Sequence, residues 1–185
     1  MSCANYNYRE RAKSMTPTDE IAGKLNDANS SKLTVSTPSD REIRMERVFD
    51  APRELVYRAF TDPELVPRWW GFRNSKTVVD KMDVRPGGSW RYVQVSPDGT
   101  EHAFRGEYRE VSPPERITWT FEYEPMAGHI LVETMSFEAI GANRTRAVTL
   151  STFDTTEERD GMLQSGMKAG AAESYERLAE LLATL

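Results

Sequence analysis

Cysteine, histidine and long apolar runs are scarce in this chain of 185 residues. The one cysteine, Cys3, permits no intramolecular disulfide, and a lone thiol is typical of a protein in a reducing compartment. The longest aliphatic run, residues 130–132, is far shorter than the roughly 20 apolar residues of a membrane-spanning helix. The first thirty residues also lack the apolar stretch of a secretory signal. We therefore expect a cytoplasmic protein that does not associate with membranes.

Positive charge is also in deficit, because 24 Lys and Arg residues against 29 Asp and Glu residues give a formal net charge of -5. A protein that binds nucleic acid normally carries a basic patch or stripe, so we expect no nucleic-acid partner. Hydrophobic residues make up 38% of the chain, which is enough for a globular core.

Motifs for common catalytic and metal sites are missing. The chain contains no G-x-S-x-G elbow, Walker loop, H-E-x-x-H or C-x-x-C. The two histidines, His102 and His129, fall on different predicted elements, so they predict neither a metal site nor a catalytic pair. We expect no metal and no cofactor. The lack of a motif favours a protein that is not an enzyme, although it leaves that question open.

Composition divides the chain into two parts. Residues 1–32 are rich in Asn, Ser, Thr and charged side chains and have few large aliphatic ones, which predicts a flexible N-terminal tail. Residues 33–185 carry the hydrophobic patterning of one domain, as expected for a chain of this length.

Alternating apolar residues and turn signals predict strands through most of the domain. The predicted strands are residues 42–49, 76–84, 90–95, 102–111, 117–123, 131–139 and 145–152. Two short helices are expected after the first strand. Pro52 suits the first turn of one, and Asp62-Pro63-Glu64 begins the next, which ends at Gly71.

A long C-terminal helix is expected to begin at Thr155 and Glu158, which have capping-box spacing. Its apolar stripe is Leu163, Met167, Ala171, Tyr175, Leu178, Leu182 and Leu185. Gly166 and Gly170 lie near this stripe, and each glycine inside a helix costs about 1 kcal/mol relative to alanine. We therefore expect a close approach of the helix to the sheet or to a ligand. The charged residues on its other faces are expected to be solvated: Glu173, Glu176, Arg177 and Glu180.

Large aromatic side chains recur at every second position of the predicted strands, so each strand presents them on one face. Together with the last helix they predict a ligand pocket. Its expected residues are Trp70, Trp90, Tyr92, Phe104, Tyr108, Trp119, Phe121, Tyr123, Met135, Phe137, Gly166, Met167 and Gly170. Val148 and Leu150 are expected to extend the same face. A filled core is the alternative interpretation. Glu133 shares the phase of Met135, and we expect it to be a solvated carboxylate at a strand end rather than a buried polar group.

Three long segments carry a family resemblance: "REIRMERVFDAPRELVYRAFTDPELVPRWWG", "MDVRPGGSWRYVQVSPDGTEHAFRGEYREVSPPERITWTF" and "GMKAGAAESYERLAELL". They resemble the family named for the C-terminal domain of the activator of heat-shock protein 90 ATPase, in the START-like (SRPBCC) superfamily. The resemblance covers residues 33–185. It implies an α+β helix-grip (START-like/Bet v-like) fold, with a curved antiparallel sheet wrapped around a long C-terminal helix and two short helices after the first strand. Where the family often has an aromatic residue, this chain has Ala171, which should enlarge a cavity beneath the helix.

Three functions follow from this resemblance. The first is binding of a small apolar or aromatic molecule in a cavity between the sheet and the C-terminal helix. The second is a co-chaperone-like module that binds a chaperone and stimulates a heat-shock protein 90 type ATPase. The third is an enzyme of the cyclase or hydratase type, for which His102, Glu133 or a tyrosine would be the base. The first is our leading prediction.

Overall fold

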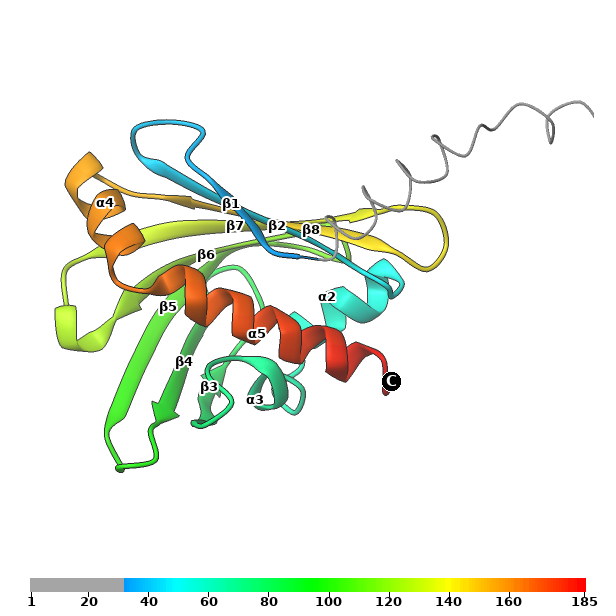
Figure 1. Ribbon diagram of the computed structural model, residues 1–185, viewed down its shortest axis with the longest axis horizontal. Helices are drawn as coiled ribbons and strands as arrows, with labels where there is room; N and C mark the ends of the chain where they lie inside the picture. Colours follow the sequence, from blue (N-terminus) through cyan, green and yellow to red (C-terminus); the bar gives the residue numbers. More distant parts are fainter. Residues whose placement is uncertain (1–31) are drawn as a thin grey trace, which may run out of the picture. The chain divides into compact units, whose positions relative to one another are not determined.

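Eight antiparallel strands form one curved sheet in the computed structural model, which describes residues 32–185 (Figure 1). The strands are β1 (Thr34–Ser36), β2 (Glu42–Phe49), β3 (Lys76–Met82), β4 (Ser89–Val95), β5 (Glu101–Ser112), β6 (Arg116–Tyr123), β7 (Ile130–Ala139) and β8 (Thr145–Thr152). Their order in the sheet is β1-β2-β8-β7-β6-β5-β4-β3. All seven predicted strands are present. β1 was missed because three residues are too few to show alternation.

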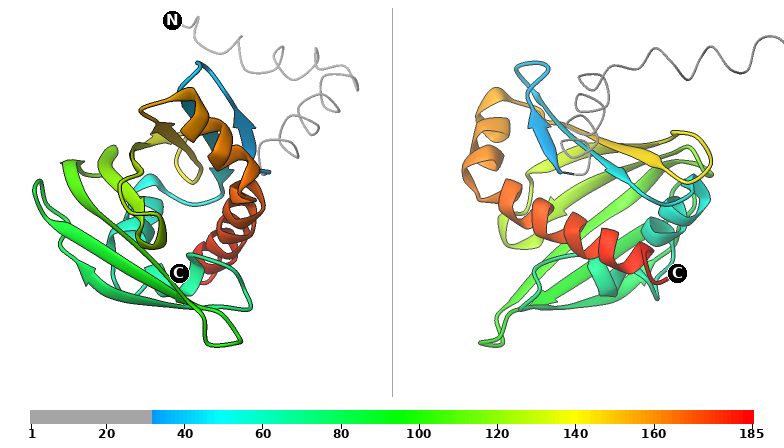
Figure 2. Two further views of the ribbon diagram at one scale, coloured as in Figure 1. Left: turned by 90° about the vertical axis from the view of Figure 1, so that its left-hand side faces the viewer. Right: turned by 45° about the vertical axis from the view of Figure 1, so that its right-hand side comes forward.

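The described residues also form four helices and one 3-10 turn, and the C-terminal helix lies along the concave face of the sheet (Figures 1 and 2). They are α2 (Arg53–Thr61), α3 (Val66–Trp69), the 3-10 turn η2 (Glu124–Met126), α4 (Thr156–Gln164) and α5 (Met167–Leu182). α5 crosses the sheet, and α2 and α3 follow β2 in the chain as expected. This arrangement confirms the α+β helix-grip fold. The predicted tail, residues 1–32, lies outside the described residues apart from Lys32. No helix of residues 32–185 is long and apolar enough to cross a bilayer.

The long C-terminal helix is present as α5, but the prediction that it begins at Thr155 is wrong, because a break at Ser165 and Gly166 separates α4 from α5. The Oγ1 atom of Thr155 accepts a hydrogen bond from the Glu158 N–H, so the predicted N-terminal cap is confirmed. Gly166, however, adopts a φ of 84°, which other residues rarely adopt, and stands at the start of α5 rather than inside a helix. Leu163 and Leu185 are 36% and 53% exposed and do not belong to the core stripe.

The face predicted for β8 is also wrong. β8 pairs with β7 so that Thr149 lies opposite Met135 and Ala147 lies opposite Phe137. Residues directly opposite each other in antiparallel strands share a face of the sheet. Thr149 and Ala147 therefore point to the concave side, while Val148, one residue away, and Leu150 point to the convex side.

The main core fills the space between the sheet, α2, α3 and the C-terminal half of α5. Its fully buried residues include Phe49, Val56, Ile117, Met135 and Leu178. Phe137 belongs to this core, where its ring packs against Tyr57 and Phe60 with centroid distances of 5.5 and 5.3 Å. A second cluster of Ile43, Met45, Leu131 and Phe153 lies where Met162 and Met167 of α4 and α5 meet the sheet.

Two of the four charged residues of α5 that were expected to be solvated, Glu173 and Arg177, are partly buried and hold the loop that follows α3, whereas Glu176 and Glu180 are exposed as expected. The guanidinium of Arg177 donates to main-chain carbonyl oxygens of the α3 end, and the Glu173 carboxylate accepts from the Arg73 N–H at 2.6 Å. Ser174, buried on the same helix, accepts from the Gly71 N–H at 3.0 Å. Glu180 forms an ion pair with Arg73. Because the C-terminal end of α3 leaves carbonyl oxygens without helical partners, α5 supplies the donors that satisfy them.

Candidate functional site

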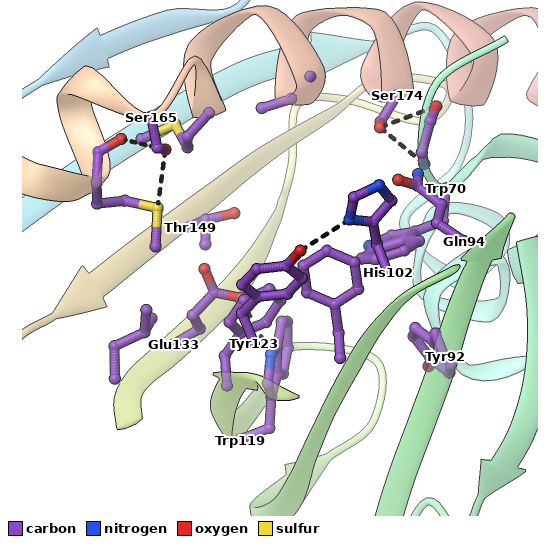
Figure 3. Close-up of a pocket in the computed structure, with 18 of the residues that line it drawn as sticks. Trp70, Tyr92, Gln94, His102, Trp119, Tyr123, Glu133, Thr149, Ser165 and Ser174 are labelled. Carbon is purple, nitrogen blue, oxygen red and sulfur yellow. Dashed lines mark hydrogen bonds between the residues drawn. The ribbon is translucent and has the colours of Figure 1, made fainter. Parts of the chain in front are cut away.

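A pocket of about 880 Å³ lies between the concave face of the sheet and the helices α4 and α5 (Figure 3). Twelve of the thirteen residues predicted to form a ligand site line it. They are Trp70, Trp90, Tyr92, Phe104, Tyr108, Trp119, Phe121, Tyr123, Met135, Gly166, Met167 and Gly170. The exception is Phe137, which is 3% exposed and belongs to the core. The volume falls within the roughly 300–1,000 Å³ that is typical of small-molecule sites.

Aromatic rings in contact with one another form one wall of the pocket. Trp70 packs edge-on against Tyr92 and Phe104, with centroid distances of 5.5 and 5.1 Å. Phe121 lies 5.7 Å from Trp90 and 5.5 Å from Phe104. Trp70 thus lines the pocket, while its neighbour Trp69 is buried and donates its indole N–H to the Ala59 carbonyl.

Gly106 makes this aromatic wall possible. A Cβ at this position would stand 1.7 Å from the Thr120 carbonyl oxygen and 2.6 Å from the indole nitrogen of Trp90. Neither distance is compatible with a side chain. The glycine therefore leaves the space on β5 that the indole of Trp90 occupies.

A carboxylate, Glu133 of β7, faces the pocket from the middle of the sheet (Figure 3). It accepts hydrogen bonds from the Trp119 indole N–H at 3.1 Å and from the Ser151 hydroxyl at 2.9 Å. Burial raises the pKa of Glu133 above its ordinary value, and these two hydrogen bonds oppose the shift. The expectation of a solvated carboxylate at a strand end is wrong. The sequence showed that Glu133 shares a strand face with Met135. How far it is buried depends on α4 and α5, which fold over β7.

Thr149 of β8 and Tyr175 of α5 form a second polar contact in the pocket, with 2.9 Å between their hydroxyl oxygens. Burial raises the pKa of Tyr175, so its hydroxyl is neutral and can donate or accept. The sequence analysis missed Thr149, Ser151 and Tyr175 as site residues. The alternation of Thr145, Ala147, Thr149 and Ser151 was a usable signal, since these small residues have the same period as the apolar ones.

A histidine and a tyrosine that line the pocket, His102 and Tyr123, are hydrogen-bonded to each other. His102 Nδ1 lies 2.7 Å from the Tyr123 hydroxyl oxygen (Figure 3). Gln94, opposite His102 in the β4–β5 pairing, also lines the pocket. Two further tyrosines are neutral, because burial raises the pKa of Tyr108 to about 12 and that of Tyr92 well above its ordinary value.

The two glycines of the last helical segment have different roles. A Cβ at Gly170 would stand 3.2 Å from Cζ of Phe72, so this glycine lets the Phe72 ring lie against α5 at the pocket edge. A Cβ at Gly166 would meet nothing within 4 Å, and its role is the backbone turn between α4 and α5. The expected close approach to the sheet is therefore found at neither glycine, and Gly170 instead lies against Phe72 of the loop that follows α3.

The charged residues that line the pocket are all acidic: Glu133, Glu157 and Glu158. Among the described residues, no Lys or Arg side chain lines it. His129 also lines it, and its Nδ1 pairs with Glu158 at 3.0 Å. Residues 32–185 contain no group of three His, Cys, Asp or Glu side chains that could hold a metal ion.

Comparison with known families agrees with this architecture. The family model described as "Activator of Hsp90 ATPase homolog 1-like protein" matches residues 50–183. The chain belongs to this family. Among curated proteins, none matches the chain.

Solved structures of bacterial proteins share the fold of this family member. A protein from Rhodobacter sphaeroides is 25% identical, with a TM-score of 0.78 and coverage of 83% of this chain and 99% of its own. Protein CV1439 from Chromobacterium violaceum is 28% identical, with a TM-score of 0.66 and coverage of 76% and 96%. The AHSA1 protein from Silicibacter pomeroyi is 22% identical, with a TM-score of 0.65 and coverage of 77% and 98%.

Proposed function

We propose that this protein binds a small, largely apolar molecule in the pocket between the sheet and α4–α5. The observation that carries the proposal is the pocket itself: about 880 Å³ lined mainly by aromatic and aliphatic side chains, with a few convergent polar groups. Sites of this kind hold small molecules by apolar burial and orient them through the few polar contacts.

The exposure of several aromatic residues that line the pocket argues against the alternative that they only fill the interior. Phe137 and Leu178, core residues that do not line the pocket, are 3% and 0% exposed. By contrast, Trp70, Phe104, Trp119 and Phe121 are only partly buried although they lie on the concave side. Covering such apolar surface stabilises a complex by roughly 25 cal/mol per Å². These residues therefore offer a ligand the surface that the protein does not cover itself.

Substitution of Ala171 tests the proposal, because this residue lines the pocket from α5. Ala171→Phe should place a ring in the cavity and weaken binding of N-phenyl-1-naphthylamine, a neutral fluorescent probe, by at least about tenfold, or ~1.4 kcal/mol. The matched control is Ala169→Phe, the same change at an exposed position of the same helix. It should leave the affinity unchanged. Absence of saturable probe binding by the parent protein, or equal losses in the two variants, would count against the proposal.

A chaperone-binding module is the second candidate, and membership of the family supports it. It makes a different prediction, since stimulation of a heat-shock protein 90 ATPase would depend on the outer surface and not on the cavity. Stimulation to the same extent by the parent and by Ala171→Phe would favour this candidate.

Native mass spectrometry of the protein from its own host adds a direct readout, because a co-purified small molecule supports the pocket proposal. Enzymatic use of Glu133 or His102 as a base would require turnover of that molecule.

A further inference from the structure

Glu133 is a partly buried acid, and no described Lys or Arg side chain bonds to it. Carboxylates that leave the solvent are usually paired with Lys or Arg. Here both hydrogen-bond donors to Glu133 are neutral, the Trp119 indole and the Ser151 hydroxyl. An ionised carboxylate has about four lone-pair positions. These two contacts use half of them, while the side chain is still open to the pocket that it lines.

The groups that titrate around the same pocket provide no fixed positive charge. On the helices, the lining groups are Tyr175 of α5 and Glu157 and Glu158 of α4. On the sheet side they are Tyr92, Tyr108, Tyr123, His102 and His129. His102 is hydrogen-bonded to Tyr123, and His129 is paired with Glu158. Arg47 of β2 acts electrostatically on Tyr175 and Glu176 but does not line the pocket. Among the described residues none places a positive charge opposite Glu133 in the pocket, so an occupant of the pocket is the remaining source.

We propose that the natural ligand is an apolar molecule that carries an amine, and that its ammonium nitrogen pairs with the carboxylate of Glu133. This inference rests on the proposed function. The apolar part of the ligand would lie against the rings of Trp70, Phe104 and Phe121, which line the same pocket. The rings also suit a cation, because the face of an aromatic ring attracts positive charge within about 6 Å.

Two other simple head groups, a carboxylic acid and an alcohol, fit this pocket less well. A carboxylic acid would bring a second negative charge into a pocket that already contains three glutamates, with no Lys or Arg lining it among the described residues. An alcohol can donate one hydrogen bond to Glu133 but brings no charge. Both ligands would donate to the carboxylate, but only the ammonium adds the attraction between opposite charges, so we expect it to bind about tenfold more tightly than the matched alcohol.

Binding of the amine should depend on pH through Glu133. Burial raises the pKa of Glu133, so the carboxyl group of the free protein gains its proton at a higher pH than an ordinary glutamate. A bound ammonium stabilises the ionised form and lowers this pKa again. Amine affinity should therefore fall as the pH is lowered through the pKa of Glu133, whereas affinity for the neutral alcohol should change little.

Three naphthalene probes of one shape test the inference by fluorescence titration: 1-naphthylmethylamine, 1-naphthylmethanol and 1-naphthoic acid. We expect the affinity order amine, alcohol, acid, with a separation of about tenfold or more at the first step. Glu133→Gln should remove the preference for the amine and leave alcohol binding within about threefold of the parent. The matched control is Glu157→Gln, which removes the same charge from an exposed residue that lines the pocket and should keep the preference.

The outcomes separate this inference from the function on which it rests. If the alcohol and the acid bind as well as the amine, or if Glu133→Gln keeps the preference, the inference is wrong and the pocket proposal stands. If none of the three probes binds saturably, the proposed function fails. Should Glu133→Gln not fold, the affinity order and its pH dependence in the parent protein decide, and a pH-independent amine affinity would overturn the inference.

Discussion

Arg177 offers the sharpest test of how α5 positions the pocket. Its guanidinium reaches the end of α3 and donates to four main-chain carbonyl oxygens. The distances are 2.8 Å to Gly71, 3.0 Å to Arg68, 3.2 Å to Phe72 and 3.3 Å to Trp70. This loop carries Trp70 and Phe72, which both line the pocket.

The structure allows the cost of Arg177→Ala to be worked out. Nη1, which has two N–H groups, is shared among three carbonyl oxygens and Nη2 donates to one, so two or three charge-assisted hydrogen bonds are lost. Such bonds contribute a net ~1.5–3 kcal/mol each when buried. Arg177 is only half-buried, so we expect a total loss of about 2–3 kcal/mol in unfolding free energy, and a fall in Tm of roughly 4–12 °C for a chain of this size.

The matched control is Glu180→Ala, which removes the ion pair between α5 and this loop. The pair of Glu180 with Arg73 is exposed, with side chains 61% and 48% accessible. Its loss should cost less than about 1 kcal/mol. Thermal melts and urea unfolding should show the larger loss of stability in Arg177→Ala. Titration with N-phenyl-1-naphthylamine should show weaker binding by Arg177→Ala alone. Equal effects of the two substitutions on stability, or unchanged probe affinity in Arg177→Ala, would refute this account of the loop.

Two further predictions concern the interior. Leu178 is 0% exposed, so Leu178→Ala should lower the unfolding free energy by about 2–5 kcal/mol in urea, whereas Glu176→Ala on the exposed side should change it by less than about 0.5 kcal/mol. Comparable losses would mean that the buried face of α5 is assigned wrongly. Because the pKa of Glu133 is raised in the folded state, the protein should lose stability relative to Glu133→Gln as the pH rises from the ordinary glutamate range, about 4.3, through this raised pKa. Urea unfolding of both proteins at several pH values measures the difference, and a constant difference would show that Glu133 titrates as a solvated group.

Periodicity alone located most of the fold and much of the candidate site. Strand alternation depends on the backbone, whose side chains point to opposite faces at every step. For that reason the pattern of Trp119, Phe121 and Tyr123 was enough to predict that these residues share one face, and all three line the pocket. The N-terminal cap at Thr155 was also predictable from local sequence, because its hydrogen bond joins groups only three residues apart.

The phase of β8 could not be obtained in this way. Its apolar residues Val148 and Leu150 suggested one face, but pairing with β7 turns Thr149 and Ser151 toward the pocket instead. The partner strand and the register decide which face is concave, and those are set by contacts distant in the sequence. The hydroxyl groups that contact Glu133 and Tyr175 therefore went unrecognised.

Seven of the eight strands, their aromatic faces and the family could be recognised from the amino-acid sequence, because these features follow from local backbone geometry and from the order of segments. The depth of Glu133, the break in the last helix and the contacts of Arg177 could not be recognised from it. Each of these depends on groups that folding brings together from distant parts of the chain. Ser151 and Glu133 are 18 residues apart, and Arg177 and Gly71 are 106 residues apart. A carboxylate has the same chemical structure on a surface and in a pocket, and its surroundings change its pKa and its preferred partner.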